Sequence, residues 1–159
     1  MAAREPQVMD PKVLAAIKDE AAGYESELTR AAHLCESPIE QLMLVALRHR
    51  LRLYPFAACK ETACAVIPQC EVTLKGRTYR VDFALVAGVS AQTECAAIEC
   101  DGHEFHERTK SQALHDRRKD RDLTTAGWIV MRFTGSEIWA DADKCAHEAL
   151  RALFAKVGL

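Results

Sequence analysis

The sequence predicts an α/β fold in which helices flank a mixed central β-sheet. The middle of the chain alternates apolar and polar residues with a period of two, which is typical of strands. A strand–helix–strand order follows from Glu94 to Phe133, and this order implies a right-handed crossover between two parallel strands. With 159 residues, 49% of them hydrophobic, one domain is expected to bury about 70% of its unfolded surface.

The first predicted element is an amphipathic helix. Asp10 and Pro11 form a helix-start signal, and an apolar stripe with a period of 3.5 residues continues to about Leu34. The stripe contains Leu14, Ile17, Ala21, Tyr24, Leu28 and Ala31. We expect residues 1–36 to form an N-terminal helix that either packs on the domain or pairs with a second copy, and residues 37–159 to form the α/β domain.

A second helix is predicted from Ser37 to about Leu53. Ser37 is suited to cap this helix, Pro38 to occupy its first turn, and Glu40 to complete a capping box. A glutamate at this position can instead point inward, and the sequence favours neither orientation.

Strands follow in the next part of the chain. The segment Ala63–Leu74 is rich in Val, Ile and Thr but is interrupted by Pro68, which predicts an edge or bulged strand. A turn at residues 75–77 should join it to a strand over Thr78–Val86. The segment Ala87–Thr93 contains Gly and Ser and is predicted to be a loop.

The remaining elements complete the crossover. Ala96–Gly102 is predicted to be a strand, Thr109–Ala126 a helix ended by glycine, and Trp128–Phe133 a buried strand. A last helical region begins at Thr134, and its segment Asp141–Val157 has an apolar face.

Asp82 is the first candidate metal ligand. Tyr79, Val81, Phe83 and Leu85 recur at every second position and are expected to share one apolar face of a strand. Asp82 would then lie on the opposite face. An aspartate between Val and Phe fits β propensity poorly, which favours a functional role over an exposed ion pair with Arg80 or Arg132.

Two further acids lie on the next predicted strand. Glu99 and Asp101 are two residues apart, so their side chains share a face. If this strand neighbours that of Asp82 at about 5 Å, the three carboxylates crowd together and need a divalent cation or a proton. Magnesium prefers such oxygen ligands, which makes Asp82, Glu99 and Asp101 the predicted metal site.

Two histidines follow the second acidic strand. His103 and His106 come just after Gly102, where a strand gives way to a loop. A histidine with a pKa near neutrality can activate a water molecule or protonate a leaving oxygen. Together with Cys95 and Cys100 they also suggest a zinc site, but the two cysteines would point to opposite faces of a regular strand, so zinc is disfavoured.

Taken in order, these residues resemble the PD-(D/E)XK, restriction-endonuclease-like superfamily, and within it the very-short-patch-repair-like endonucleases. The resemblance covers residues ~37 to 139. The matching positions are Val81-Asp82-Phe83, Glu99-Cys100-Asp101-Gly102, His103, His106, Asp116, Lys119, Asp120, Leu123, Gly127-Trp128 and Arg132-Phe133.

The resemblance implies a restriction-endonuclease-like fold and a Mg²⁺-dependent endonuclease, with Mn²⁺ as a substitute ion, that hydrolyses phosphodiester bonds in DNA during repair or restriction. It implies catalytic roles for Asp82, Glu99, Asp101, His103 and His106, and a supporting role for Glu40. One departure stands out: the superfamily lysine two positions after Glu99 is Asp101 here. In the short-patch branch, histidines take over acid–base work.

Basic side chains suggest a nucleic-acid contact. They are Arg48, Arg50, Arg52, Lys110, Arg117, Arg118, Lys119 and Arg121. Phosphates are the expected partners of such a strip. The alternative is a solvated helix face in which Asp116, Asp120 and Asp122 form ion pairs with these residues. The net charge of −2 excludes a global positive field.

A different class of function stays open. A catalytically degenerate relative could keep the fold and bind nucleic acid or a protein partner, and the missing lysine favours this alternative. The seven cysteines include no Cys-x-x-Cys pair and suggest reduced thiols. No membrane segment or targeting signal is evident, so a soluble cytoplasmic protein is expected.

Overall fold

The structure is a computed structural model that describes residues 11–54, 62–89, 92–102 and 110–159. The described elements are α1 (Pro11–Ala32), α2 (Pro38–Leu53), β1 (Thr62–Leu74), β2 (Arg77–Val89), β3 (Gln92–Asp101), α3 (Lys110–Thr125), β4 (Ile129–Thr134) and α4 (Gly135–Val157).

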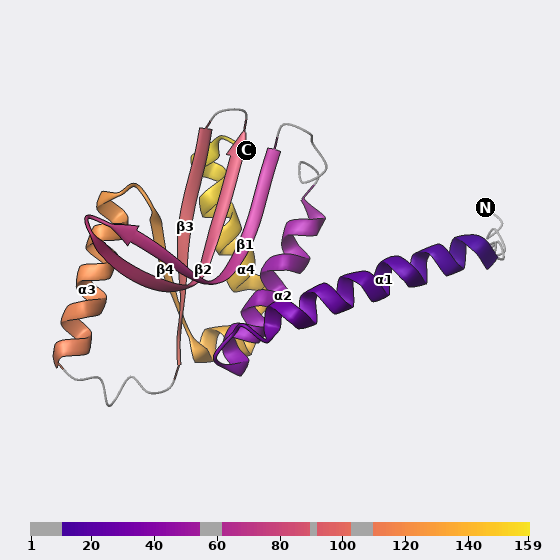
Figure 1. The fold of residues 1–159 in the computed structure, drawn as a ribbon, viewed down its shortest axis with the longest axis horizontal. Coiled ribbons are helices and arrows are strands. Elements are labelled where there is room, and N and C mark those ends of the chain that lie inside the picture. Colours follow the sequence, from indigo (N-terminus) through magenta and orange to yellow (C-terminus); the bar gives the residue numbers. More distant parts are fainter. Residues whose placement is uncertain (1–10, 55–61, 90–91, 103–109) are drawn as a thin grey trace, which may run out of the picture.

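The described strands form one mixed sheet in the order β1-β2-β3-β4. β1 and β2 are antiparallel, as are β2 and β3, whereas β3 and β4 are parallel. The helix α3 supplies the crossover between the parallel pair (Figure 1). The predicted α/β class, the mixed sheet and the strand–helix–strand order are therefore confirmed.

The helices cover the sheet on two sides. Side chains of α2 and α4 pack with Phe83, Leu85 and Ile98 in the larger core cluster. Leu123 of α3 packs with Val81 and Ala97 in a smaller cluster. Because Ala97 and Ile98 are adjacent on β3 and belong to different clusters, the two clusters lie on opposite faces of the sheet.

The β1–β2 hairpin is longer than predicted. Lys75 (φ 49°) and Gly76 (φ 74°) form a two-residue turn, and Arg77 already pairs with Leu74. Positive φ at both turn positions is the geometry that matches the twist of a hairpin. The loop predicted at Ala87–Thr93 is wrong in its described part: β2 continues to Val89 because Ala87 is fully buried in the larger core cluster.

The hairpin changes faces at Asp82. Val81 packs on the α3 side of the sheet, whereas Phe83, two residues later, packs on the α2–α4 side. On β1 the corresponding position is Gln69, which has a positive φ of 49° and follows Pro68. The expectation that Tyr79, Val81, Phe83 and Leu85 share one face is therefore wrong. Figure 1 shows the hairpin curving across the sheet toward α3.

The helix α1 projects from the body of the domain (Figure 1). Only Ala31 of its residues is buried, whereas Val13, Leu14 and Ile17 are 51%, 43% and 48% exposed. Whether this helix pairs with a second copy stays a prediction, as does the division of the chain at residue 36. None of the described helices is long and apolar enough to cross a membrane.

Candidate active site

A buried ion pair joins β3 to the crossover helix. Glu99 faces α3 because its neighbour Ile98 packs on the opposite side of the sheet. Lys119 Nζ lies 2.7 Å from Glu99 Oε2 and also donates to the carbonyl oxygen of Arg80 at 3.1 Å. Glu99 is 6% exposed and Lys119 is 7% exposed. The side chain of Lys119 is thus fixed by one charged and one neutral acceptor.

Asp82 lies at the point where β2 separates from β3. The pairing between β2 and β3 ends at Phe83 and Ile98. One residue further along β2, Asp82 Oδ2 accepts a hydrogen bond from the backbone N–H of Cys100 at 2.6 Å. The Asp82 carboxylate thus replaces a backbone carbonyl as the acceptor for the N–H of Cys100. Because Cys100 follows Glu99 on β3, this hydrogen bond holds Asp82 next to the part of β3 that carries Glu99.

Burial shapes the charges of both acids. It raises the pKa of Glu99 to about 7, against the opposing effect of the Lys119 ammonium, and the charge of Asp82 raises it further. Burial also raises the pKa of Asp82, the N–H of Cys100 lowers it, and the charge of Glu40 raises it. Glu99 Oε1 is buried and has no hydrogen-bond partner within the described part of the chain.

Asp101 is held by Arg132. Arg132 Nη1 lies 3.1 Å from Asp101 Oδ1, and Arg132 Nη2 lies 2.9 Å from Asp120 Oδ1. The guanidinium therefore bridges the end of β3 to α3. Asp101 shares the face of Glu99, as predicted, but its carboxylate is engaged by a cation instead of facing an open site.

Glu40 combines the two orientations that the sequence left open. Its carboxylate accepts hydrogen bonds from Ser37 Oγ at 2.8 Å and from the N–H of Glu36 at 2.9 Å, so it caps α2. It also accepts from Gln69 Nε2 at 2.7 Å and is 7% exposed. Because its charge raises the pKa of Asp82, the capping carboxylate also acts on the site.

The described acids do not form a cage with three ligands. Among residues 11–54, 62–89, 92–102 and 110–159, no group of three or more His, Cys, Asp or Glu side chains is arranged to hold a metal ion. His103 and His106 lie outside the described residues. Two carboxylates, those of Asp82 and Glu99, are the oxygen donors that the described site offers, and Mg²⁺ commonly takes one or two carboxylates while keeping several waters.

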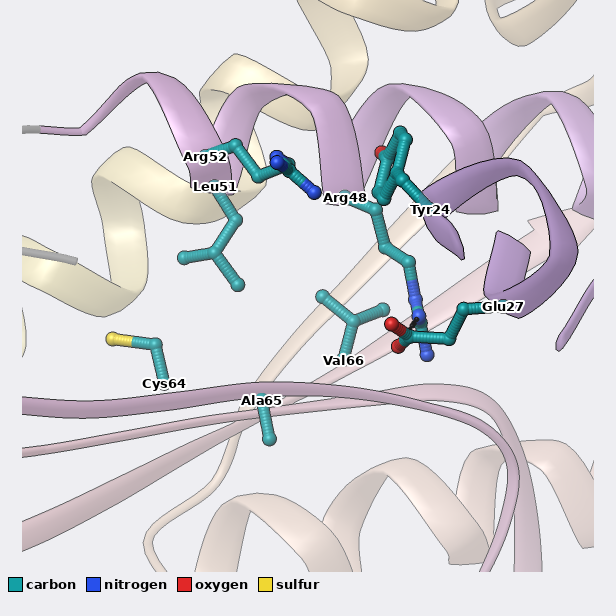
Figure 2. A pocket seen from close by; sticks show the side chains of 8 residues that line it. All are labelled: Tyr24, Glu27, Arg48, Leu51, Arg52, Cys64, Ala65 and Val66. Carbon is teal, nitrogen blue, oxygen red and sulfur yellow. Dashed lines mark hydrogen bonds and ion pairs between the residues drawn. The ribbon is translucent and has the colours of Figure 1, made fainter. Parts of the chain in front are cut away.

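The basic residues of α2 are paired within the chain. Arg48 lies 2.6 Å from Glu27, Arg52 lies 3.7 Å from Glu20, and Arg50 pairs with Asp143. Figure 2 shows Arg48 directed at Glu27 beside a pocket of about 340 Å³. The guanidinium of Arg52 stacks over Tyr24 at 4.2 Å. No acid of the candidate site lines this pocket.

The basic residues of α3 divide between two faces. Arg117, Arg118 and Arg121 are exposed, whereas Lys119 is buried against Glu99. The side chain of Lys110 lies outside the described part. Lys119 therefore does not belong to the predicted strip, and a nucleic-acid contact of the three exposed arginines stays a prediction.

Lys119 is the site residue whose role the sequence analysis missed. The sequence pattern places it among the nucleic-acid contacts, whereas the structure buries its ammonium group against Glu99. A signal existed: Lys119 precedes the fully buried Leu123 by four residues, so both lie on one face of α3. A lysine on the buried stripe of a helix requires a partner, because an unpaired buried charge is costly.

Similarity to known proteins is found at the level of a protein family. No curated protein and no solved structure matches the chain. A family model described as REase_MTES_1575, a restriction-endonuclease-like family, matches residues 56–153, which is more than half of the chain and includes Asp82, Glu99 and Lys119. This family is consistent with the PD-(D/E)XK superfamily and with the observed mixed sheet flanked by helices. The chain therefore belongs to the restriction-endonuclease-like family REase_MTES_1575.

Proposed function

We propose that the protein is a metal-dependent endonuclease that hydrolyses phosphodiester bonds in DNA, with Mg²⁺ as its ion and Mn²⁺ as a substitute. The observation that carries the proposal is the contact of Lys119 with Glu99 beside Asp82. Two carboxylates and one ammonium in a buried setting are the groups that phosphodiester hydrolysis needs for metal binding and charge stabilisation. Membership of a restriction-endonuclease-like family supports nuclease activity.

The proposed ligands are Asp82 and Glu99. Both ligands are carboxylates, which suit a hard cation, and Glu99 Oε1 is buried without a hydrogen-bond partner among the described residues. Burial disfavours the ionised form of both acids, and a bound cation would offset this cost. A divalent ion bound there would polarise a phosphoryl oxygen and lower the pKa of a bound water.

The other residues take supporting roles in this proposal. Lys119 holds Glu99 in place and presents a positive charge where negative charge develops on the phosphate. Asp101 acts through Arg132, and Glu40 acts through the pKa of Asp82. His103 and His106 stay proposed proton-transfer groups, and the order of motifs from Asp82 to Phe133 supports the very-short-patch-repair-like branch.

A catalytically degenerate nuclease fold that binds nucleic acid or a protein is the second candidate. The observation that favours it is the pairing of Asp101 with Arg132, which removes one of the three predicted ligands. Such a protein would bind its nucleic-acid or protein partner without a metal requirement.

Cleavage of supercoiled plasmid DNA in Mg²⁺, in Mn²⁺ and in EDTA tests the proposal. Asp82→Ala, Glu99→Gln and Lys119→Met should abolish cutting, while circular dichroism shows an intact fold. Lys144→Gln, which changes an exposed charge on α4 outside the site, serves as the matched control and should cut like the wild type. Cutting that persists in Asp82→Ala would overturn the assignment.

Calorimetric titration with Mn²⁺ separates the two candidates. The endonuclease should bind the ion, and Asp82→Ala should lose that binding. A wild-type protein that neither binds Mn²⁺ nor cuts DNA, but still shifts a DNA duplex in a gel, would establish the degenerate alternative.

A further inference from the structure

Positive charge concentrates at the tip of the β1–β2 hairpin. Lys75 Nζ and Arg77 Nη1 lie 3.8 and 3.9 Å from the carboxylate of Asp122 on α3. The pKa of Asp122 is lowered first by a hydrogen bond from Tyr79, and then by the charges of Lys75, Arg77 and Arg118. Arg118 lies one helical turn before Asp122 on α3 and is exposed. Among the described residues, three cations therefore lie near one carboxylate, which leaves an excess of positive charge.

The carboxylate at the centre is already committed. Tyr79 Oη donates to Asp122 Oδ2 at 2.5 Å, and the Asp122 side chain is only 15% exposed. By contrast, the side chains of Lys75 and Arg77 are 59% and 53% exposed. Their contacts with Asp122 lie near the outer limit of an ion pair, so both cations face solvent and stay free to meet another anion.

The tip is held rigidly against α3. Pairing between β1 and β2 continues to Leu74 and Arg77, next to the two-residue turn, and the hydroxyls of Thr73 and Thr78 lie 3.0 Å apart. Tyr79 is 2% exposed, and its ring lies 5.8 Å from that of His115 on α3. A fixed platform lowers the entropic cost of binding a partner.

The contrast with α2 sets this surface apart. Each of the predicted contact residues Arg48, Arg50 and Arg52 has its own acidic partner in the chain. Each of these three arginines on α2 is therefore paired with one acidic residue, whereas Lys75 and Arg77 at the hairpin tip share the single carboxylate of Asp122. Phosphate is the anion class that such a surplus recognises on a nucleic acid.

We propose that Lys75, Arg77 and Arg118, here called the hairpin-tip surface, bind the phosphate backbone of the DNA on which the Asp82–Glu99 site acts. This inference rests on the proposed function. Arg77 and Asp82 are five residues apart on β2, a span of at most about 17 Å. That length corresponds to about five base pairs of duplex, so one DNA molecule reaches both places.

Fluorescence anisotropy with a labelled 20-base-pair duplex tests the surface without cleavage. The full chain is titrated in EDTA at several KCl concentrations between 50 and 200 mM. Lys75→Gln/Arg77→Gln should lower the slope of log affinity against log salt by about two, since each lost phosphate contact removes roughly 0.9, and should weaken binding tenfold or more at 100 mM. Arg118→Gln, on a different element, should lower the slope by about one.

The matched control is Lys144→Gln/Arg151→Gln, which removes the same number of exposed charges from α4. Its salt slope should equal that of the wild type. An unchanged slope in the hairpin variants, equal weakening by the control, or a wild type that does not bind the duplex would each overturn the hairpin-tip surface. Loss of cleavage with intact binding would instead overturn only the proposed activity, and thermal melting verifies that every variant is folded.

Discussion

The ammonium group of Lys119 donates a hydrogen bond to Glu99 Oε2 at 2.7 Å, although the two residues are 20 positions apart in the sequence. The crossover makes this contact: β3 carries Glu99, the chain passes through α3, and α3 packs back against the face from which Glu99 projects. The cation that contacts Glu99 therefore comes from the helix, whereas the residue two positions after Glu99 on the strand is Asp101. The Lys119 ammonium opposes the rise that burial causes in the pKa of Glu99.

Removing the charge of Lys119 should lower the stability of the protein, because it leaves the buried carboxylate of Glu99 without a cation. Lys119→Met is expected to lower the free energy of unfolding by roughly 3 kcal/mol at pH 8, because Glu99 loses its ionic partner. The loss should be smaller at pH 6, where Glu99 can be neutral. Urea denaturation measures both values. In the double variant Lys119→Met/Glu99→Gln the losses should not add, and strict additivity would contradict the pairing.

The stability of the metal-free protein should depend on pH through Glu99. Its pKa of about 7 in the folded chain exceeds the reference value of 4.5, so the folded state favours the protonated form. This contribution is complete below about pH 4.5 and is lost as the pH rises through about 7. We expect the free energy of unfolding to fall by up to about 3 kcal/mol from pH 5 to pH 8.

Comparison with Glu99→Gln isolates this contribution. The variant cannot titrate at residue 99, so its stability should vary less than that of the wild type over the same pH range. Urea denaturation in EDTA at pH 5, 6, 7 and 8 supplies the curves. A wild type that gains stability relative to the variant as the pH rises would show that Glu99 ionises with a depressed pKa.

Local signals in the sequence were sufficient for most of the fold. Ser37 caps α2 and accepts a hydrogen bond from the N–H of Glu40, as predicted, but the Glu40 carboxylate accepts from the N–H of Glu36 and not from that of Ser37. At the predicted start of the last helix, Thr134 and Glu137 form a complete capping box. The parallel pairing of β3 with β4 followed from element order alone. The errors arose where tertiary packing overrode local preference, as at Ala87, where Gly88 suggested a loop but the core continued the strand.

The candidate site was harder to predict, because its geometry depends on a change of face. Asp82 and Glu99 were identified from strand periodicity, but the regular alternation assumed for β2 fails at the level of Gln69, a non-glycine residue with positive φ. Lys119 lies in a run of charged residues that resembles a solvated helix face. Its four-residue spacing to Leu123 indicates burial, but its partners Glu99 and Arg80 are identified only by the contacts of α3 with the sheet.

Arg132 should be more important to stability than an ordinary surface cation. It bridges Asp101, which is 7% exposed, and Asp120. Arg132→Gln should lower the free energy of unfolding by roughly 2–3 kcal/mol, because Asp101 loses its guanidinium partner. The free energy of unfolding of Arg132→Lys should lie between those of the wild type and Arg132→Gln. A single ammonium group keeps the charge but does not reproduce the planar guanidinium that contacts two carboxylates.

The partners of Arg132 provide the control. Asp120 has a side chain that is 34% exposed, so Asp120→Asn should cost less than Arg132→Gln. Urea denaturation at one pH ranks the three variants. If Asp120→Asn were the most damaging, the bridge would depend on α3 and not on the buried acid of β3.

Gly135 couples the start of α4 to the end of β3 that carries Asp101. A Cβ at this position would lie 2.6 Å from Ile39 Cδ1 and 3.5 Å from the carbonyl oxygen of Asp101. Gly135→Ala should therefore destabilise the protein by up to about 1 kcal/mol, since the half-buried Ile39 side chain must shift its terminal methyl group. Adding Ile39→Val removes the Cδ1 atom and should restore most of the loss. Urea denaturation of the single and double variants measures the rescue, and an unrescued Gly135→Ala would place the strain in the backbone at Asp101 instead.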